Sequence, residues 1–354
     1  MFLTDFIGYL GIGVYSEVLK AFNSFTQEDY VIKVVKKEYL VRDDRNNLRS
    51  ILDRLSDHEH KNITALAEFF QDKKYYYLVY QYNPGGMMWD YLLNSEYYDE
   101  KMVACIIKQI LSVLIYAHGK EILHKDLRLE NIMIDDALLD VPCVKINDFG
   151  TSVEYKHKDK KVKKSRKMTF WPLYFIAPEI LHSVEYTEKS DLWSVGIIMY
   201  FMLTGVIPTK GITNKLTFNN IKSKDFGIEK LVQNKVINEE AGDLLSKLLD
   251  RDFNARYSPV QAYNHPWIIK YAKNQNEESS ITPEIRSKFV DEWNYYQLQW
   301  DCMNYFGIYL LNSMHIEKIK ENAKQVKEDI TELFSYDELF EALHSKLIAI
   351  THII

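Results

Sequence analysis

The sequence predicts an α+β protein with two lobes, a small β-rich lobe followed by a large helical lobe, plus a C-terminal helical extension. Short segments rich in Val, Ile, Tyr and Phe fill the first part, whereas apolar residues recur every three or four positions after residue 82. A polar stretch, KNQNEESS from Lys273, then marks a linker. The predicted parts are therefore residues 1–82, 83–272 and 273–354.

The first lobe is expected to be a mostly antiparallel sheet with one helix, around Asn47 to Leu55. Runs of β-branched and aromatic residues bounded by turn residues are typical of strands. The strand segments are FIGYLGIG, SEVLKAF, YVIKVVKK, ITALAEFFQD and KYYYLVYQY. The segment YNPGG, Tyr82 to Gly86, combines Pro with Gly and predicts a hinge to the second lobe.

Helices are expected to dominate the second lobe and the extension. The apolar run that starts at Val195 is too short to span a bilayer and predicts a buried core helix. The periodic segments are Met102 to Ala117, Leu192 to Leu203, Ala241 to Leu249 and Pro259 to Tyr263. In the extension, Thr282 and Pro283 are typical of a helix start. The apolar stripe of that helix is expected to pack on the rest of the protein, and it consists of Ile285, Phe289, Trp293, Tyr296, Trp300 and Met303.

The composition is typical of an intracellular globular protein. Of the 354 residues 47% are hydrophobic, and a formal charge of -6 gives the whole chain no attraction to nucleic acid or an anionic membrane. We therefore expect neither partner and no membrane span. From the first residues, including Phe2, we expect neither a signal peptide nor N-myristoylation of this form. The widely spaced Cys105, Cys143 and Cys302 fit no metal cluster or disulfide framework, which indicates a reducing compartment, the cytoplasm.

Gly11, Gly13 and Lys33 are candidates for binding phosphates. The two glycines, in LGIGVYSEV, allow backbone N–H groups to approach phosphates, although glycine pairs are also common in hairpin turns. Lys33, in VIKVV, lies in an apolar strand, where a lysine either needs a partner or faces water from a sheet edge.

Asp126, Asn131 and Asp148 are candidates for phosphoryl transfer, which needs bound metal ions and an aligned hydroxyl group. Asp148 follows a short strand, and its carboxylate is a suitable ligand for Mg²⁺. Asn131 offers a second oxygen ligand, and Asp126 is then free to accept the hydroxyl proton.

In this order the segments resemble the motifs of eukaryotic protein kinases. The matching segments are GIGVYSEV, Lys33, HKDLRLEN, DFG at Asp148 to Gly150, APE at Ala177 to Glu179, DLWSVG from Asp191, and Arg256. The resemblance implies the bilobal protein kinase fold, with Glu179 paired to Arg256. It also implies a protein serine/threonine kinase that transfers the γ-phosphoryl group of ATP, bound with Mg²⁺, to a protein hydroxyl.

The resemblance assigns a role to each matching residue. Asp126 would orient the substrate hydroxyl, and Asn131 and Asp148 would hold Mg²⁺. Arg128 stands where the family's phosphate-contacting lysine stands. The residues expected to bind ATP are Leu10, Gly11, Ile12, Gly13, Val18, Val31, Lys33, Gln81, Tyr82, Met133 and Asp148.

The segments YFIAPEIL and NHPWI are similar in sequence to those of the calmodulin-regulated and calcium-dependent kinases. The calcium-dependent kinases carry EF-hands after the kinase domain. No D-x-[DN]-x-[DN]-G loop follows Lys273. The segment from Ile330 resembles the exit helix of an EF-hand whose loop is degenerate. If Glu338 were the last ligand of that loop, Lys327 would occupy the position of the first ligand and Glu332 that of the turn glycine. We expect no calcium site, and a helical tail that braces the kinase domain or docks a partner protein.

Positions near the nucleotide depart from the family pattern. The Glu expected to pair with Lys33 aligns with Leu48 or Ile51, and neither forms an ion pair. Val31 replaces the usual Ala, and the bulky Tyr80 occupies the gatekeeper position, so the nucleotide pocket is expected to be narrower.

Substrate-facing positions depart as well. Met87 replaces an acid that often reads a basic substrate residue, although Glu130 remains. Trp171 and Pro172 replace the usual Gly-Thr before APE, and Pro removes a backbone N–H. Recognition of a peptide is therefore in question.

The basic run of residues 156–167 predicts either a solvated loop or a functional site. The functional alternatives are an acidic substrate, an anionic surface, or phosphorylation at Ser165 or Thr169. Lys125, in place of Arg, offers a loop phosphate only a point charge, so control by phosphorylation is less expected.

Three hypotheses remain. The favoured one is an active kinase, because every group that touches metal or the reacting phosphate is present. The alternative is a pseudokinase scaffold with weak or no catalysis. The third is an allosteric regulator that uses the tail and the basic run.

Overall fold

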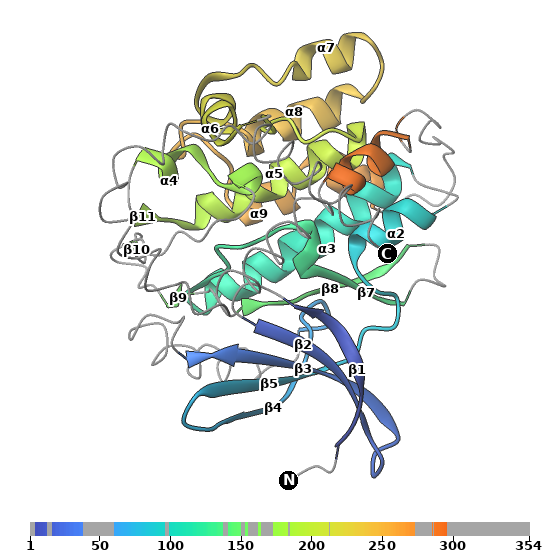
Figure 1. The fold of residues 1–354 in the computed structure, drawn as a ribbon. Coiled ribbons are helices and arrows are strands. Elements are labelled where there is room, and N and C mark those ends of the chain that lie inside the picture. The colour runs from blue at the N-terminus through green and yellow to red at the C-terminus, as the bar shows by residue number, and fades with distance from the viewer. Residues whose placement is uncertain are drawn as a thin grey trace, which may run out of the picture.

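The computed structural model describes residues 4–12, 16–37, 60–95, 99–136, 141–149, 153–154, 162–163, 173–182, 185–211, 213–272, 285 and 287–295. A β-sheet lobe and a larger helical lobe lie one above the other (Figure 1). The predicted bilobal α+β fold is confirmed. The predicted helix at Asn47 to Leu55 lies outside the described residues.

The N-terminal lobe is one antiparallel sheet with the strand order β1-β2-β3-β5-β4. The strands are β1 (Thr4–Ile12), β2 (Ser16–Asn23), β3 (Glu28–Lys36), β4 (Leu66–Gln71) and β5 (Tyr75–Gln81). All five predicted strands are present. The fourth begins later than predicted, because Ile63 forms a bridge with Ile146 of the other lobe.

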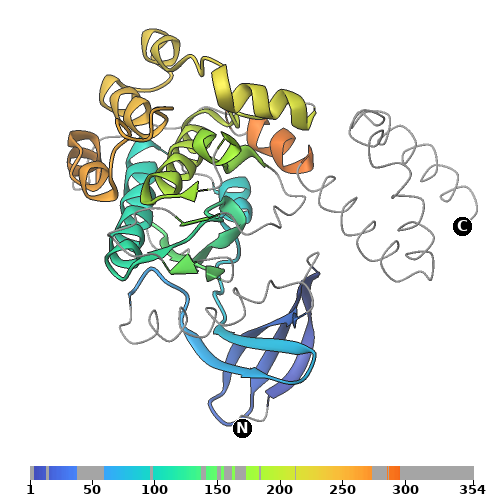
Figure 2. The same cartoon turned by 90° about the vertical axis from the view of Figure 1, so that its left-hand side faces the viewer.

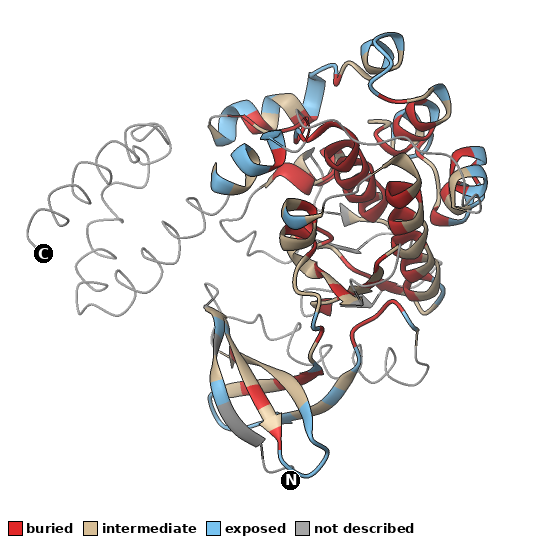
Figure 3. Cartoon of the chain, turned by 90° about the vertical axis from the view of Figure 1, so that its right-hand side faces the viewer, coloured by how far each residue is buried: buried red, intermediate tan, exposed pale blue. Residues whose placement is uncertain are grey.

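The C-terminal lobe is built around α3 (Glu100–Gly119) and α5 (Glu188–Thr204). All residues from Ser190 to Thr204 are buried, as predicted for the longest apolar run. Figure 3 shows these two helices at the buried centre of the lobe. In the described chain, only α3 has the length and composition of a membrane span, but 61% of that window is buried, as in a core helix.

Shorter elements complete this lobe. The helices are α2 (Met88–Asn94), α4 (Pro178–His182), α6 (Asn214–Ser223), α7 (Ile228–Gln233), α8 (Glu239–Leu248), α9 (Pro259–Tyr263) and α10 (Pro266–Tyr271). The short strands pair as β6 (Ile122–Leu123) with β9 (Val153–Glu154), β7 (Ile132–Asp136) with β8 (Cys143–Ile146), and β10 (Val162–Lys163) with β11 (Glu185–Tyr186). Two 3-10 turns are η2 (Leu129–Asn131) and η4 (Leu173–Phe175).

The start of the C-terminal extension packs into the helical lobe. Residues 285 and 287–295 are helical (orange in Figures 1 and 2). The Phe289 ring lies 5.0 Å from that of Phe201, and the Trp293 ring lies 5.3 Å from that of Trp89. The predicted packing is confirmed for Ile285, Phe289 and Trp293. The rest of the predicted stripe, Tyr296, Trp300 and Met303, lies outside the described residues.

Candidate active site

The loop between β6 and η2 is fixed by a buried carboxylate at the start of α5. Asp191 is 2% exposed and accepts hydrogen bonds from the backbone N of His124 (3.0 Å) and of Lys125 (2.9 Å). His118 Nε2 lies 2.8 Å from the same carboxylate. Burial alone raises the pKa of Asp191, but the contact with His118, the His124 charge and the Lys125 amide outweigh it and lower that pKa. Lys125 has a left-handed backbone (φ 70°), an uncommon conformation that the hydrogen bond to Asp191 helps to hold.

Asp126 and Asn131 face each other across this loop. Asn131 Nδ2 donates to the backbone O of Asp126 (2.7 Å) and to Asp126 Oδ2 (3.1 Å). Burial is the main cause that raises the pKa of Asp126, and the Asp148 carboxylate adds to it while Arg128 opposes it. Since the amide nitrogen of Asn131 bonds to Asp126, its amide oxygen points to the opposite side.

Asp148 lies directly after β8 and beside Asn131. The backbone N of Asn147 donates to Asn131 O (2.8 Å), and Asn147 Oδ1 accepts from the backbone N of Asp148 (2.7 Å). Asp148 has φ 62°, a left-handed conformation that is uncommon outside glycine. This backbone orients the carboxylate toward the N-terminal lobe, where it meets Lys33.

Lys33 Nζ lies 2.6 Å from Asp148 Oδ1. The lysine is in β3, between β2 and β5, and its side chain is 20% exposed, so it does not face water from a sheet edge. The contact joins the sheet to the segment that follows β8. The partner that sequence alignment left open is, among the described residues, the carboxylate of Asp148; Leu48 and Ile51 lie outside them.

The donor set fits magnesium. Mg²⁺ takes oxygen ligands and usually binds one or two carboxylates together with substrate phosphates. Asp148 and Asn131 supply one carboxylate and one amide oxygen. A closed structural metal site requires a cluster of such ligands. Within the described residues, no group of three or more His, Cys, Asp or Glu side chains could hold a metal ion.

A family model described as protein kinase domain matches residues 5–268. The chain belongs to the protein kinase family. It is 34% identical to calcium-dependent protein kinase 4 of Plasmodium berghei (strain Anka) over 276 residues, which are 78% of this chain and 51% of that protein. It is 32% identical to myosin light chain kinase A of Dictyostelium discoideum over 291 residues, 81% of this chain and 94% of that protein.

The Plasmodium falciparum (isolate 3D7) calcium-dependent protein kinase 4 is also 34% identical, over 76% of this chain and 50% of the relative. The chain therefore spans about half the length of the first relatives it matches. The predicted resemblance to calcium-dependent kinases is confirmed at the level of homology. The EF-hand-like segment, residues 327–338, lies outside the described residues.

The kinase pair expected at the base of the C-terminal lobe is present. Glu179 accepts from Arg256 Nη1 (2.8 Å) and Nη2 (2.9 Å), and Ser190 Oγ donates to the same carboxylate (2.9 Å). Arg256 has no exposed surface, so this is a buried two-pronged ion pair. The pair ties α4, which follows the substrate-facing positions Trp171 and Pro172 in the chain, to the loop before α9.

Arg128 points toward Glu130 in this structure. Arg128 Nε lies 2.8 Å from Glu130 Oε2, and the two side chains are 6% and 15% exposed. The positive charge of Arg128 also opposes the rise in the pKa of Asp126 that burial causes. The pairing with Glu130 was not predicted, because no motif links the two side chains to each other.

The predicted nucleotide-binding residues of the N-terminal lobe share one sheet. Gly11 pairs with Val18, Val18 with Lys33, and Val31 with Tyr80. Cross-strand partners lie on the same face, so Val18, Val31 and Lys33 line one side of the sheet. Leu10 is 49% exposed, Ile12 ends β1, and Gly13 lies outside the described residues.

The hinge carries Gln81 and Tyr82. Gln81 pairs with Tyr30 at the end of β5, and the backbone N of Tyr82 donates to Asp29 O (3.3 Å). Lys20 Nζ lies 2.6 Å from Asp29 Oδ2 and 4.2 Å from the centre of the Tyr82 ring. These contacts, which join β2 and β3 to the hinge, were missed because no motif contains Lys20 or Asp29.

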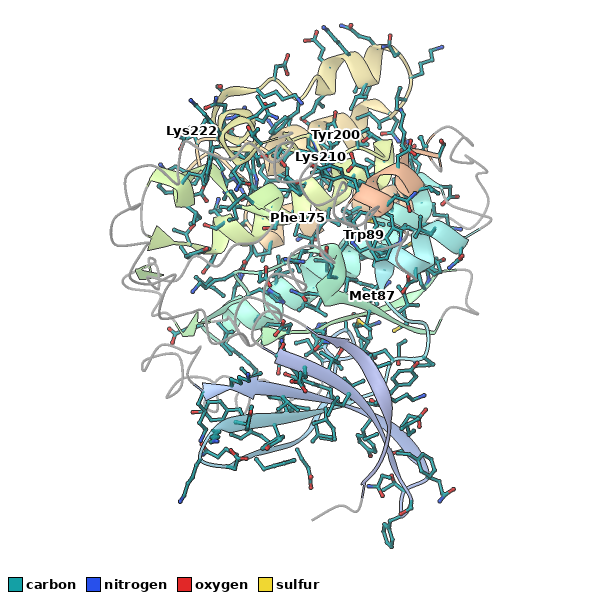
Figure 4. The ribbon with its side chains drawn as sticks, viewed as in Figure 1. Met87, Trp89, Phe175, Tyr200, Lys210 and Lys222 are labelled. Carbon is teal, nitrogen blue, oxygen red and sulfur yellow. The ribbon has the colours of Figure 1, made fainter. Side chains whose placement is uncertain are left out.

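Met133 lies next to the end of the hinge segment. It lies in β7 and forms an isolated bridge with Met87, which precedes α2 (Figure 4). Met87, which replaces the acid that often reads a basic substrate residue, thus lies next to β7. Trp171 and Pro172 lie outside the described residues, as do residues 156–161 and 164–167 of the basic run.

Proposed function

We propose that the chain is an ATP-dependent protein serine/threonine kinase that uses Mg²⁺ and transfers the γ-phosphoryl group to a protein hydroxyl. The observation that carries this proposal is one continuous set of contacts between the lobes. Lys33 contacts Asp148, Asn147 links Asp148 to Asn131, and Asn131 contacts Asp126. Membership of the kinase family and the names of the relatives support it.

Each residue has a role in this proposal. Asp148 and Asn131 would hold Mg²⁺, which neutralises charge on the phosphates when bound. Lys33, and Arg128 on the opposite side, would contact phosphate oxygens. Asp126 orients the substrate hydroxyl and accepts its proton, while Asp191 keeps the loop in position.

The pseudokinase alternative receives less support. The observation that favours a pseudokinase is that Lys33 forms an ion pair with Asp148, the carboxylate that would bind Mg²⁺. An ion pair between partly exposed groups is easily exchanged for a metal and a phosphate, however, because each charge gains a new partner. The match to kinases over most of this chain also favours the enzyme.

The test compares the purified chain with its Asp126→Asn variant, using Mg·ATP and casein as a general substrate. Because the variant lacks the proton acceptor, we expect phosphoryl transfer to fall by about 10²–10⁴-fold. Stabilisation by Mg·ATP in a thermal shift should remain, since Asp126 is not placed as a metal ligand. Equal transfer by the two proteins contradicts the proposal, and stabilisation without transfer by the wild type indicates a pseudokinase.

We also expect the acid limb of kcat to lie at a higher pH than an ordinary aspartate gives. Burial raises the pKa of Asp126, so the ionised base is lost as pH falls through this raised pKa. The measurement is kcat against pH with saturating Mg·ATP and substrate. A limb at the usual Asp pKa of about 3.9 contradicts it.

The wider setting of the chain is also a proposal. A protein substrate follows from kinase activity, and the aromatic stripe of the sequence supports a partner protein that docks on the predicted helical extension. Cys105 and Cys143 are free thiols, which supports a reducing, intracellular location.

A further inference from the structure

Lys20 of β2 bridges two elements at the hinge end of the N-terminal sheet. Its Nζ lies 2.6 Å from Asp29 Oδ2 of β3 and 4.2 Å from the centre of the Tyr82 ring. The face of an aromatic ring carries negative partial charge and attracts a cation placed over it. One ammonium group therefore links β2, β3 and the first residue of the hinge.

These three side chains share the face of the sheet that carries predicted nucleotide-binding residues. Lys20 pairs with Val31, and Val31 pairs with Tyr80. Residues that pair directly across strands project from the same face, and so do residues two apart in one strand. Asp29 lies two residues before Val31, and its backbone O accepts from the N of Tyr82 (3.3 Å), which extends the pairing of β3 with β5 to the hinge. Lys20 is thus a neighbour of Val31 on the nucleotide face.

Lys33 lies at the other end of this face. It follows Asp29 by four residues in β3, which is roughly 13 Å along a strand. Its Nζ contacts Asp148, the proposed metal ligand, at 2.6 Å. In the proposed function the phosphates of ATP bind at this end, so the nucleoside end of ATP points toward Asp29 and the hinge. Lys20 and Tyr82 therefore meet where the nucleoside would bind.

We propose that Lys20 is a positioning residue for the nucleoside end of ATP, because it holds the Tyr82 ring against β2 and β3. This inference rests on the proposed function, in which Val31 and Tyr82 bind ATP. Without Lys20 the strands keep their backbone pairing, but the Tyr82 ring loses the ammonium that fixes it. The ring must then be ordered when ATP binds, which costs affinity. The reacting phosphate lies at the opposite end, so the rate of transfer is not affected.

The test is the Lys20→Met variant of the full chain, with Lys37→Met as the matched control. Lys37 makes the same kinds of contact at the far end of the sheet: its Nζ lies 4.6 Å from the centre of the Tyr76 ring and 2.5 Å from Gln71 Oε1. The probe is a non-hydrolysable ATP analogue, titrated by calorimetry with Mg²⁺ and again with EDTA. The kcat with Mg·ATP and casein is measured in parallel.

For Lys20→Met we expect affinity for the analogue to fall about two- to fivefold, the change that corresponds to one lost cation–π contact. The loss should be the same with Mg²⁺ and in EDTA, because Lys20 is remote from the metal ligands, and kcat should not change. Lys20→Arg should restore wild-type affinity, since a guanidinium also stacks on aromatic rings and pairs with carboxylates. Lys37→Met should bind as the wild type does.

A double-mutant cycle with Tyr82→Leu shows whether Lys20 acts through the ring. Once the ring is absent, Lys20→Met should cause no further loss of affinity, because coupled residues are not additive. A full further loss in the Tyr82→Leu background overturns the inference, since Lys20 then acts without Tyr82.

Equal affinity of Lys20→Met and the wild type overturns the inference while the proposed function stands. A loss that appears only with Mg²⁺ also overturns it, because the effect then lies at the metal end of the site. An equal loss in Lys37→Met overturns it as well, since it indicates a general effect on the sheet. If the wild type does not bind the analogue with Mg²⁺, the proposed function fails and the inference fails with it.

Discussion

Arg256→Ala is expected to lower the free energy of unfolding by about 3–5 kcal/mol, the usual effect of removing one member of a buried ion pair. Arg256 is fully buried and binds both oxygens of Glu179. Its removal leaves that carboxylate, which is 7% exposed, without its main counter-charge. The measurement is urea unfolding of the variant and the wild type under the same buffer and salt.

Arg256 also holds the neighbouring backbone. Its Nε donates to Asp250 O (2.9 Å), its Nη1 donates to Lys189 O (2.7 Å), and its guanidinium lies 5.2 Å from the Trp193 ring centre. Arg256→Lys is therefore expected to lose much of the stability although it keeps the charge, because an ammonium has no planar fork.

The matched control is Lys270→Ala, which removes an exposed ion pair. Lys270 Nζ lies 3.1 Å from Glu240, and the two side chains are 46% and 39% exposed. Exposed pairs of this kind contribute little to stability. If Arg256→Ala has an effect as small as Lys270→Ala, the buried pair does not stabilise the lobe as we infer.

The elements predicted from sequence were those set by local patterns. The β-branched and aromatic residues of β2, β3 and β5, the helical period of α3 and the continuous apolar run of α5 are all patterns of near neighbours in the chain. The candidate residues Asp126 and Asn131 were recognised for a similar reason, because they share one short loop. Their positions relative to Asp148 followed from the order of the motifs.

The partners of charged side chains were less predictable. Lys33 and Asp148 are distant in the chain, and only the packing of the two lobes brings them together. Arg128 and Glu130 are near in sequence, yet nothing in a residue pattern says that an arginine turns to a nearby acid rather than to a ligand. Such choices depend on the burial of both groups, which composition does not reveal.

Phe289 belongs to the predicted extension after residue 272, and its ring is buried in the core of the helical lobe, as expected for the apolar stripe. Phe289 is 1% exposed and packs on Phe201 of α5. Nearby, Lys210 Nζ binds Glu292 (2.5 Å) and lies 3.8 Å from the Tyr295 ring centre (Lys210 is labelled in Figure 4). Residues 285 and 287–295 are thus held by apolar and charged contacts together.

We expect Phe289→Ala to lower the free energy of unfolding of the full chain by about 3–5 kcal/mol, since it leaves a cavity next to α5. The control is Val290→Ala: Val290 is the next residue on the same helix and is 41% exposed, so its effect should stay within about 0.5 kcal/mol. Urea unfolding of both variants measures the difference. Equal stability of the two variants would mean that the extension is separable from the kinase lobe, whereas a large difference makes these residues part of its core.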